Sequence, residues 1–134
     1  MNVQDIEIIL VEDNPDDAAL TLRAFKSRSL FNSFIHLKNG QEAIDYLEQL
    51  DLMSLPNLIV LDLNMPILSG TQTLLQIKNN KNLKSIPVII FSTSANENEK
   101  RKCLSFGAVD YLVKPSNYAD GRELIQKFLT YLNS

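Results

Sequence analysis

Five polar residues of this 134-residue chain each stand where a short apolar run ends: Glu12, Asp13, Asp62, Ser92 and Lys114. Carboxylates held about 4 Å apart repel one another by roughly 4 kcal/mol at an effective dielectric of 20. Three neighbouring carboxylates would therefore raise one another's pKa values unless a cation lies between them. A ligand set of oxygens, without Cys or His, selects a hard ion, so we expect a Mg2+ site.

The same residues suggest phosphoryl chemistry. Beside bound Mg2+, an aspartate oxygen can attack phosphorus and form an aspartyl phosphate. Lys114 could then neutralise charge on the phosphoryl oxygens, and Ser92 could donate a hydrogen bond to one of them. A metal site, a nucleophile, a cation and a hydroxyl group are thus all available.

Five apolar runs carry these residues and predict five strands, at 6–11, 34–37, 58–61, 88–91 and 110–113. Most of them are rich in Ile, Val or Leu without strict alternation, as expected of strands covered on both faces. The run at 34–37 contains His36, which predicts an edge strand.

The segments between the runs carry helix signals. Asn14 before Pro15 is typical of a capped helix start. Ser69 with Gln72, and Ser94 with Glu97, each predict a capping box. Gly107 predicts the end of a helix over 95–106. A last helix is expected from four further apolar residues: Leu124, Ile125, Phe128 and Leu132.

Alternating strands and helices predict a parallel sheet covered by helices on both faces. Five strands are too few for an eight-stranded barrel. We therefore expect one α/β domain over 1–134, a flavodoxin-like doubly wound (βα)5 sheet with strand order 2-1-3-4-5. Its crevice lies at the carboxyl ends of strands 1 and 3, where the five polar residues would converge.

Composition excludes several function classes. A net charge of −3 and the lack of a basic run give no reason to expect nucleic-acid or membrane binding. The single cysteine, Cys103, excludes an internal disulfide. No apolar stretch approaches the ~20 residues that span a bilayer, and the first residues lack signal-peptide features, so we expect a cytoplasmic protein. His36, the only histidine, cannot build a zinc site or a Ser-His-Asp triad.

Alternatives remain for the site and for its residues. A magnesium-dependent phosphohydrolase would need a second Asp after its nucleophile, where this chain has Asn64. A flavin-binding module conflicts with the acidic segment 12–17, which would repel a phosphate. Asp62 could instead cap a helix, Ser92 could be a turn hydroxyl, and Tyr111 could be an ordinary core aromatic.

Four segments resemble the signature segments of response-regulator receiver domains, and they run in the family's order: ILVEDNPDD, LDLNMPILSG, PVIIFSTS and GAVDYLVKP. The resemblance covers essentially the whole chain. EDNPDD and IPVIIFSTS look particularly like the single-domain regulators associated with phytochromes and related histidine kinases.

The resemblance implies a role for each matching residue. Asp62 matches the phosphoacceptor. Asp13 matches a direct Mg2+ ligand, Glu12 a ligand acting through water, and Asn64 the residue whose backbone carbonyl binds the metal. Three further matches are Ser92 to the switch hydroxyl, Tyr111 to the switch aromatic, and Lys114 to the lysine that contacts the phosphoryl group, before a proline bond that is usually cis.

The resemblance also implies partners. A sensor histidine kinase, of the phytochrome type if the subfamily holds, or a histidine phosphotransfer protein would supply the phosphoryl group. The chain ends after its fifth helix, so we expect no attached output domain and signalling through helix 4, strand 5 and helix 5. The sequence neither shows nor excludes a homodimer, and the protein would catalyse only its own phosphorylation and dephosphorylation.

Overall fold

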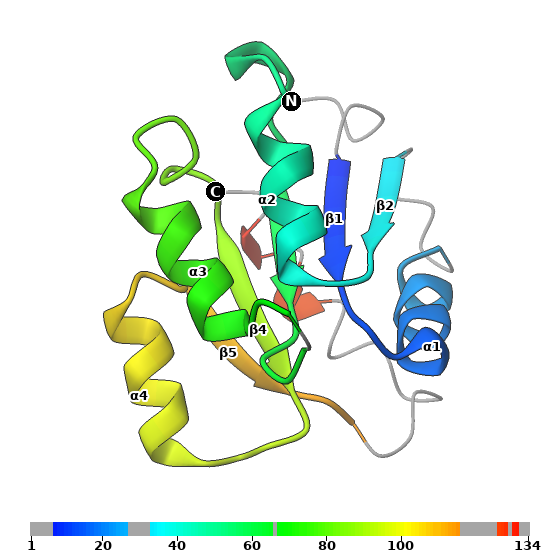
Figure 1. Cartoon of the computed structure of the whole chain (residues 1–134). Coiled ribbons are helices and arrows are strands. Elements are labelled where there is room, and N and C mark those ends of the chain that lie inside the picture. Colours follow the sequence, from blue (N-terminus) through cyan, green and yellow to red (C-terminus); the bar gives the residue numbers. More distant parts are fainter. Residues whose placement is uncertain (1–6, 27–32, 66, 116–125, 129, 132–134) are drawn as a thin grey trace.

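A five-stranded sheet forms the centre of the computed structural model, which describes residues 7–26, 33–65, 67–115, 126–128 and 130–131 (Figure 1). The strands and helices follow one another as β1 (Glu7–Val11), α1 (Pro15–Lys26), β2 (Ser33–Leu37), α2 (Gly40–Glu48), the 3-10 turn η2 (Leu52–Ser54), β3 (Leu58–Leu61), α3 (Gly70–Asn79), β4 (Val88–Ser92), α4 (Glu97–Ser105) and β5 (Asp110–Val113).

All strand pairs are parallel, and their order is β2-β1-β3-β4-β5. This confirms the predicted topology, including β2 at an edge. Every residue of β3 and β4 is buried, which explains why these strands read as continuous apolar runs rather than as alternating patterns. The doubly wound order leaves β1 and β3 adjacent, and their carboxyl ends lie side by side.

Each face of the sheet has its own core. On one face, α2, α3 and α4 pack through Ala43, Leu74 and Cys103 against alternate strand residues. On the other face, α1 contributes Phe25 and the carboxyl-terminal helical segment contributes Phe128. The rings of Phe25 and Phe128 lie 5.0 Å apart between centroids, and burial of such large side chains holds this layer on the sheet.

The helix ends test the capping predictions. Asn14 accepts hydrogen bonds from the first turn of α1, and Ser69 forms a complete capping box with Gln72, so both predictions are confirmed. The capping box predicted at Ser94 is wrong, because Asn96 caps α4 and the helix begins at Glu97. Gly107 follows the end of α4 with a φ of 111°, the left-handed conformation that glycine adopts without steric cost.

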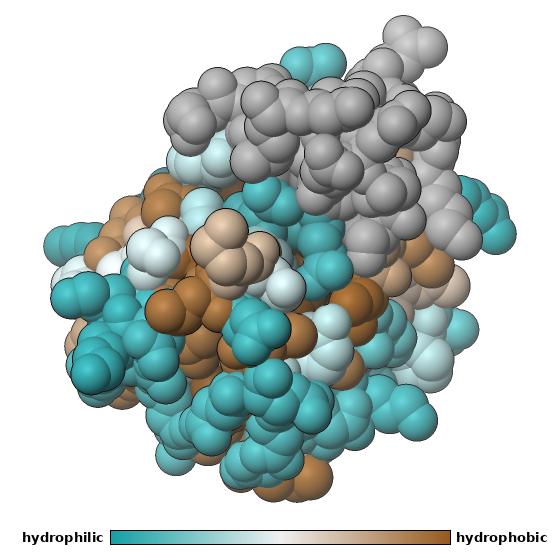
Figure 2. Space-filling view, turned by 90° about the horizontal axis from the view of Figure 1, so that it is seen from above, coloured by the Kyte–Doolittle hydropathy of each residue, from teal (hydrophilic) through white to brown (hydrophobic). Residues whose placement is uncertain are grey.

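The remaining features lie away from the carboxyl ends of the strands. The turn η2 was not predicted, and its Leu52 and Met53 are exposed. The end of the molecule at which β1 and β2 begin carries hydrophobic residues among hydrophilic ones (Figure 2).

Of the predicted last helix, Phe128 is helical and buried, whereas Leu124, Ile125 and Leu132 lie outside the described residues. Within the described part of the chain, no helix has the length and apolar character to cross a membrane.

Candidate functional site

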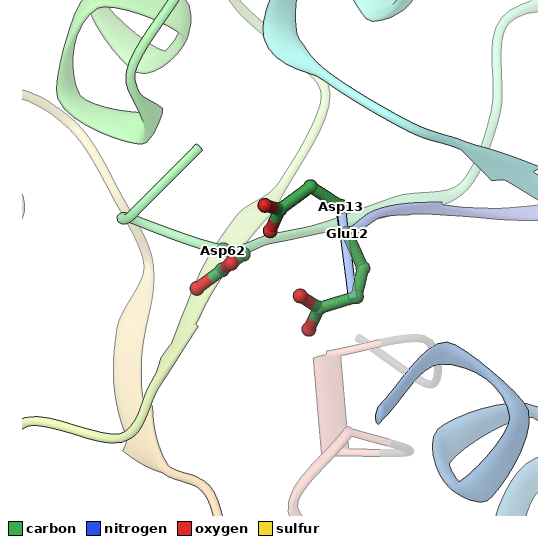
Figure 3. Close-up of side chains that lie close together, drawn as sticks. All are labelled: Glu12, Asp13 and Asp62. Atoms are coloured by element: carbon green, nitrogen blue, oxygen red, sulfur yellow. The ribbon is translucent and has the colours of Figure 1, made fainter. Parts of the chain in front are cut away.

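Three carboxylates meet where β1 and β3 end. Glu12 and Asp13 follow β1 directly, and Asp62 follows β3. Each offers an oxygen that lies within 4.8 Å of the others, and the side chains border a shared space (Figure 3). Glu12 and Asp62 are buried, whereas Asp13 is exposed at the opening. The predicted convergence of the acidic residues is confirmed.

Lys114, which follows β5, supplies the positive charge of the site. Its Nζ lies 2.5 Å from Glu12 Oε1, 3.2 Å from Asp17 Oδ2 and 3.7 Å from Asp62 Oδ1. The Lys114 side chain is itself buried, and burial opposes its charge. The hydrogen bond to Glu12 and the charge of Asp62 outweigh that effect, so the pKa of Lys114 is raised.

Asp62 is the carboxylate with the most unfavourable surroundings. Burial, followed by the charge of Glu12, raises the pKa of Asp62 to about 7. Lys114 and the backbone N–H of Asn64 lower the pKa, but they do not compensate, because Lys114 lies nearer to Glu12 than to Asp62. The ionised form of Asp62 therefore lacks a counterion of its own, and a cation beside it would favour that form.

The loop after Asp62 is pressed against the first residue of α3. A Cβ atom added at Gly70 would lie 2.2 Å from the Asp62 carbonyl oxygen and 2.6 Å from Leu63 Cα. Gly70 N–H also donates a hydrogen bond to Leu63 at 2.9 Å. Only glycine permits this approach, so α3 directly supports the backbone that carries Asp62.

A second polar group connects β4, β5 and the start of α4. Ser92 is fully buried, and its Oγ accepts a hydrogen bond from Ser94 N–H at 3.1 Å. The Tyr111 hydroxyl donates to the Ser94 carbonyl at 2.8 Å and contacts Glu99 Oε2 at 3.2 Å. Burial raises the pKa of the Tyr111 phenol. Ser92 and Tyr111, the two predicted switch residues, both bind the backbone of Ser94, Ser92 at its N–H and Tyr111 at its carbonyl.

Sequence reasoning missed three contacts of this site. Asp17 lies in the first turn of α1, which begins just after Glu12 and Asp13, and this nearness in the sequence could have indicated its approach to Lys114. Glu99 contacts Tyr111, and His36 contacts the Glu12 carbonyl, in each case from another element. No spacing in the sequence predicts either contact. The cis bond expected before Pro115 is also wrong, since the described residues contain no cis peptide bond.

The donor set fits a hard divalent cation. It consists of carboxylate oxygens alone, drawn from Glu12, Asp13 and Asp62, with two of the three carboxylates buried. Glu12 is already bound to Lys114, which leaves Asp13 and Asp62 as the carboxylates with free capacity. Oxygen ligands of this kind, completed by water, are those Mg2+ prefers.

Comparison with known proteins gives a consistent result. Residues 8–126 match the family model described as the response regulator receiver domain. The response regulator Rcp1 of Synechocystis sp. is 35% identical over 122 residues, which cover 89% of this chain and 83% of that protein. The probable methanogenesis regulatory protein FilR2 of Methanothrix harundinacea is 34% identical, over 92% of this chain and 81% of that protein.

Solved structures share the fold. The Mn2+-bound form of Rcp1 superposes with a TM-score of 0.81 at 34% identity, covering 93% of this chain and 92% of Rcp1. The phosphorylated cyanobacterial phytochrome response regulator RcpA gives a TM-score of 0.85 at 32% identity, covering 96% of this chain and 94% of RcpA.

Proposed function

Because this chain belongs to the response regulator receiver domain family, we propose that Asp62 accepts a phosphoryl group from a phosphohistidine of a partner protein. The observation that carries the proposal is the placement of Asp62 itself. It is buried beside two further carboxylates, and the Lys114 ammonium group lies 3.7 Å from it but is bound more closely by Glu12. A carboxylate in this setting can act as a nucleophile when a cation is bound beside it.

Mg2+ is the cofactor we assign to the site, in line with the Mn2+ bound by Rcp1. Asp13 and Asp62 would hold it directly, Glu12 would act through water, and the Asn64 carbonyl would complete the protein ligands. When bound, the ion supplies positive charge that screens the carboxylates from the incoming phosphoryl oxygens.

The transfer step needs little beyond alignment and charge. A P–O bond forms between an Asp62 oxygen and phosphorus while the P–N bond to the donor histidine breaks. The electron pair leaves with the imidazole nitrogen, which takes a proton from solvent. Lys114 is placed to stabilise negative charge on the phosphoryl group, and Ser92 can donate a hydrogen bond to it.

The signal would leave the domain through protein contacts. We assign the phosphodonor as a sensor histidine kinase, of the phytochrome type given the similarity to RcpA, or a histidine phosphotransfer protein. The downstream partner would bind the face formed by α4, β5 and the carboxyl-terminal helix, which Tyr111 connects to the site. On this proposal, residues 1–134 act as a single-domain regulator in the cytoplasm whose only catalysis is its own phosphorylation and dephosphorylation.

Phosphorylation by a small donor tests the proposal. Acetyl phosphate with Mg2+ should add one acid-labile phosphoryl group, which intact-mass measurement would detect as a single adduct. Asp62→Asn should abolish the adduct because the amide cannot act as the nucleophile. Asp51→Asn is a matched control, since Asp51 is exposed and its side chain caps nothing.

Two results would contradict the assignment. An adduct that persists in Asp62→Asn would place the phosphoryl group elsewhere. Turnover of a small phosphate ester faster than about 1 s⁻¹, the lower end of common enzyme rates, would favour the phosphohydrolase alternative.

A further inference from the structure

The segment that carries Glu12 and Asp13 is held to the sheet from the β2 side. The ladder between β1 and β2 ends with Glu12 N–H donating to the Leu37 carbonyl at 3.0 Å. The carbonyl of Glu12 points toward the same neighbouring strand, because the N–H and C=O of one strand residue share a side. One more ladder bond would need the N–H of Asn39, but there the chain turns to cap α2.

The His36 side chain takes the place of that missing ladder bond. Its Nε2 lies 2.7 Å from the Glu12 carbonyl oxygen. Within the part of the chain that the structure describes, this carbonyl has no other recorded hydrogen-bond donor. A carbonyl only accepts, so Nε2 must carry the hydrogen. Nε2 is a donor in the neutral tautomer and in the protonated ring alike, so the contact does not depend on the charge of His36.

This contact matters because of the peptide it holds. The Glu12 carbonyl and the Asp13 amide are two ends of one planar unit, so fixing the carbonyl also fixes the direction in which the chain enters Asp13. The Glu12 side chain has its own anchor in Lys114. Asp13 differs, because its carboxylate makes no recorded hydrogen bond or ion pair with a described residue. The orientation of Asp13 therefore depends on its backbone.

We propose that His36 is a positioning residue for the cation site, and that its Nε2–H bond to the Glu12 carbonyl fixes the peptide that presents Asp13. The proposal rests on the Mg2+ binding assigned above. Groups that orient metal ligands from behind typically change metal affinity by 10- to 100-fold when they are removed. Because His36 acts through the backbone rather than on a ligand atom, we expect an effect of about 10-fold.

Two amide substitutions separate the hydrogen bond from the rest of the side chain. The terminal nitrogen of Gln reaches about as far along the side chain as Nε2 of His, whereas that of Asn reaches only about as far as Nδ1. His36→Gln should therefore keep a donor near the Glu12 carbonyl, and His36→Asn should lose it. The dissociation constant for Mg2+, measured by isothermal titration, should rise about 10-fold in His36→Asn and stay within about 2-fold of wild type in His36→Gln.

Stability without metal provides the second readout. The free energy of unfolding in EDTA is measured for the wild type and for both variants. A loss of stability in a variant under these conditions reports a purely structural role of His36. If His36→Asn binds Mg2+ as tightly as wild type, or if His36→Gln loses as much affinity as His36→Asn, the positioning role is wrong. A wild-type chain that binds no Mg2+ would instead overturn the proposed metal site, and this role with it.

Discussion

Two neighbouring helices flank the site and are attached to the sheet very differently. α3 and α4 are of similar length and are both capped at their first turn. α3 buries Gly70, Thr73, Leu74 and Ile77, whereas α4 buries only Cys103. In Figure 1, both lie on the same side of the sheet, with α4 next to β5.

The difference separates a fixed part of the site from a movable part. Through Gly70, α3 packs closely against the backbone of Asp62, so the proposed phosphoacceptor has a rigid support. α4 has little apolar burial, and part of its attachment is the contact of the Tyr111 hydroxyl with Glu99, beside the bond of that hydroxyl to Ser94 in the loop before the helix. Elements with few buried contacts open at low free energy. The proposed phosphorylation site thus lies on the rigid side, and the proposed switch residue Tyr111 lies on the weakly held side.

Truncating one leucine in each helix gives the largest expected contrast. Leu74 of α3 is fully buried, so Leu74→Ala should lower the free energy of unfolding by about 2–5 kcal/mol. Leu104 of α4 is 38% exposed, so Leu104→Ala should cost less than about 1 kcal/mol. Urea titration of both variants measures these values, and equal losses would break the comparison.

The pH dependence of the free energy of unfolding should show that ionisation of Asp62, on the rigid side, is unfavourable. The pKa of Asp62 is about 7 in the folded chain and about 3.9 when unfolded. Between these values the folded state holds a proton that the unfolded state has lost. The contribution of Asp62 to the free energy of unfolding therefore falls as pH rises from about 4 to 7, and it stays low above that.

Comparison with Asp62→Asn isolates this contribution. The free energy of unfolding is measured for both proteins in EDTA across that pH range. The value for the wild type minus the value for Asp62→Asn should decline toward neutral pH. A difference curve that is flat or rises with pH would show that Asp62 ionises easily, and would remove the electrostatic reason for a cation there.

The smallest expected effect is on the attachment of α4. Glu99→Ala removes one acceptor of the Tyr111 hydroxyl, while the Ser94 carbonyl remains. We expect a loss of about 0.5–1 kcal/mol in the opening free energy of α4, seen as roughly 2- to 5-fold faster amide hydrogen exchange in that helix. Glu97→Ala removes the same charge from the same helical turn and is the matched control. Equal acceleration in both variants would remove Glu99 from the attachment.

Burial explains why the sheet and the acidic site could be predicted from the sequence. Strands covered on both faces must be continuously apolar, so Glu12, Asp13 and Asp62 stand out where those runs stop. The parallel order then brings them together without any information on side-chain contacts. The exact start of α4 depends instead on tertiary contacts: Ser94 and Asn96 are both good caps, and the Tyr111 hydroxyl holds the Ser94 carbonyl outside the helix.

Contacts made by long side chains across elements could not be predicted in this way. The partners of Lys114 show the limit, because its charge was predicted to act on phosphoryl oxygens, and nothing in the sequence indicated that its nearest partner in the structure is Glu12 rather than Asp62. Which of two carboxylates a lysine approaches depends on ångström-scale differences in side-chain placement, and the spacing of residues does not encode them.

The solitary cysteine of the chain lies on the underside of α4, at 1% exposure. Burial raises the pKa of its thiol, and a thiol without access to water reacts slowly with alkylating reagents. The rate at which an alkylating reagent labels Cys103 therefore reports how often α4 separates from the sheet. Because no other cysteine competes, a single mass adduct would measure this opening rate in the unmodified protein.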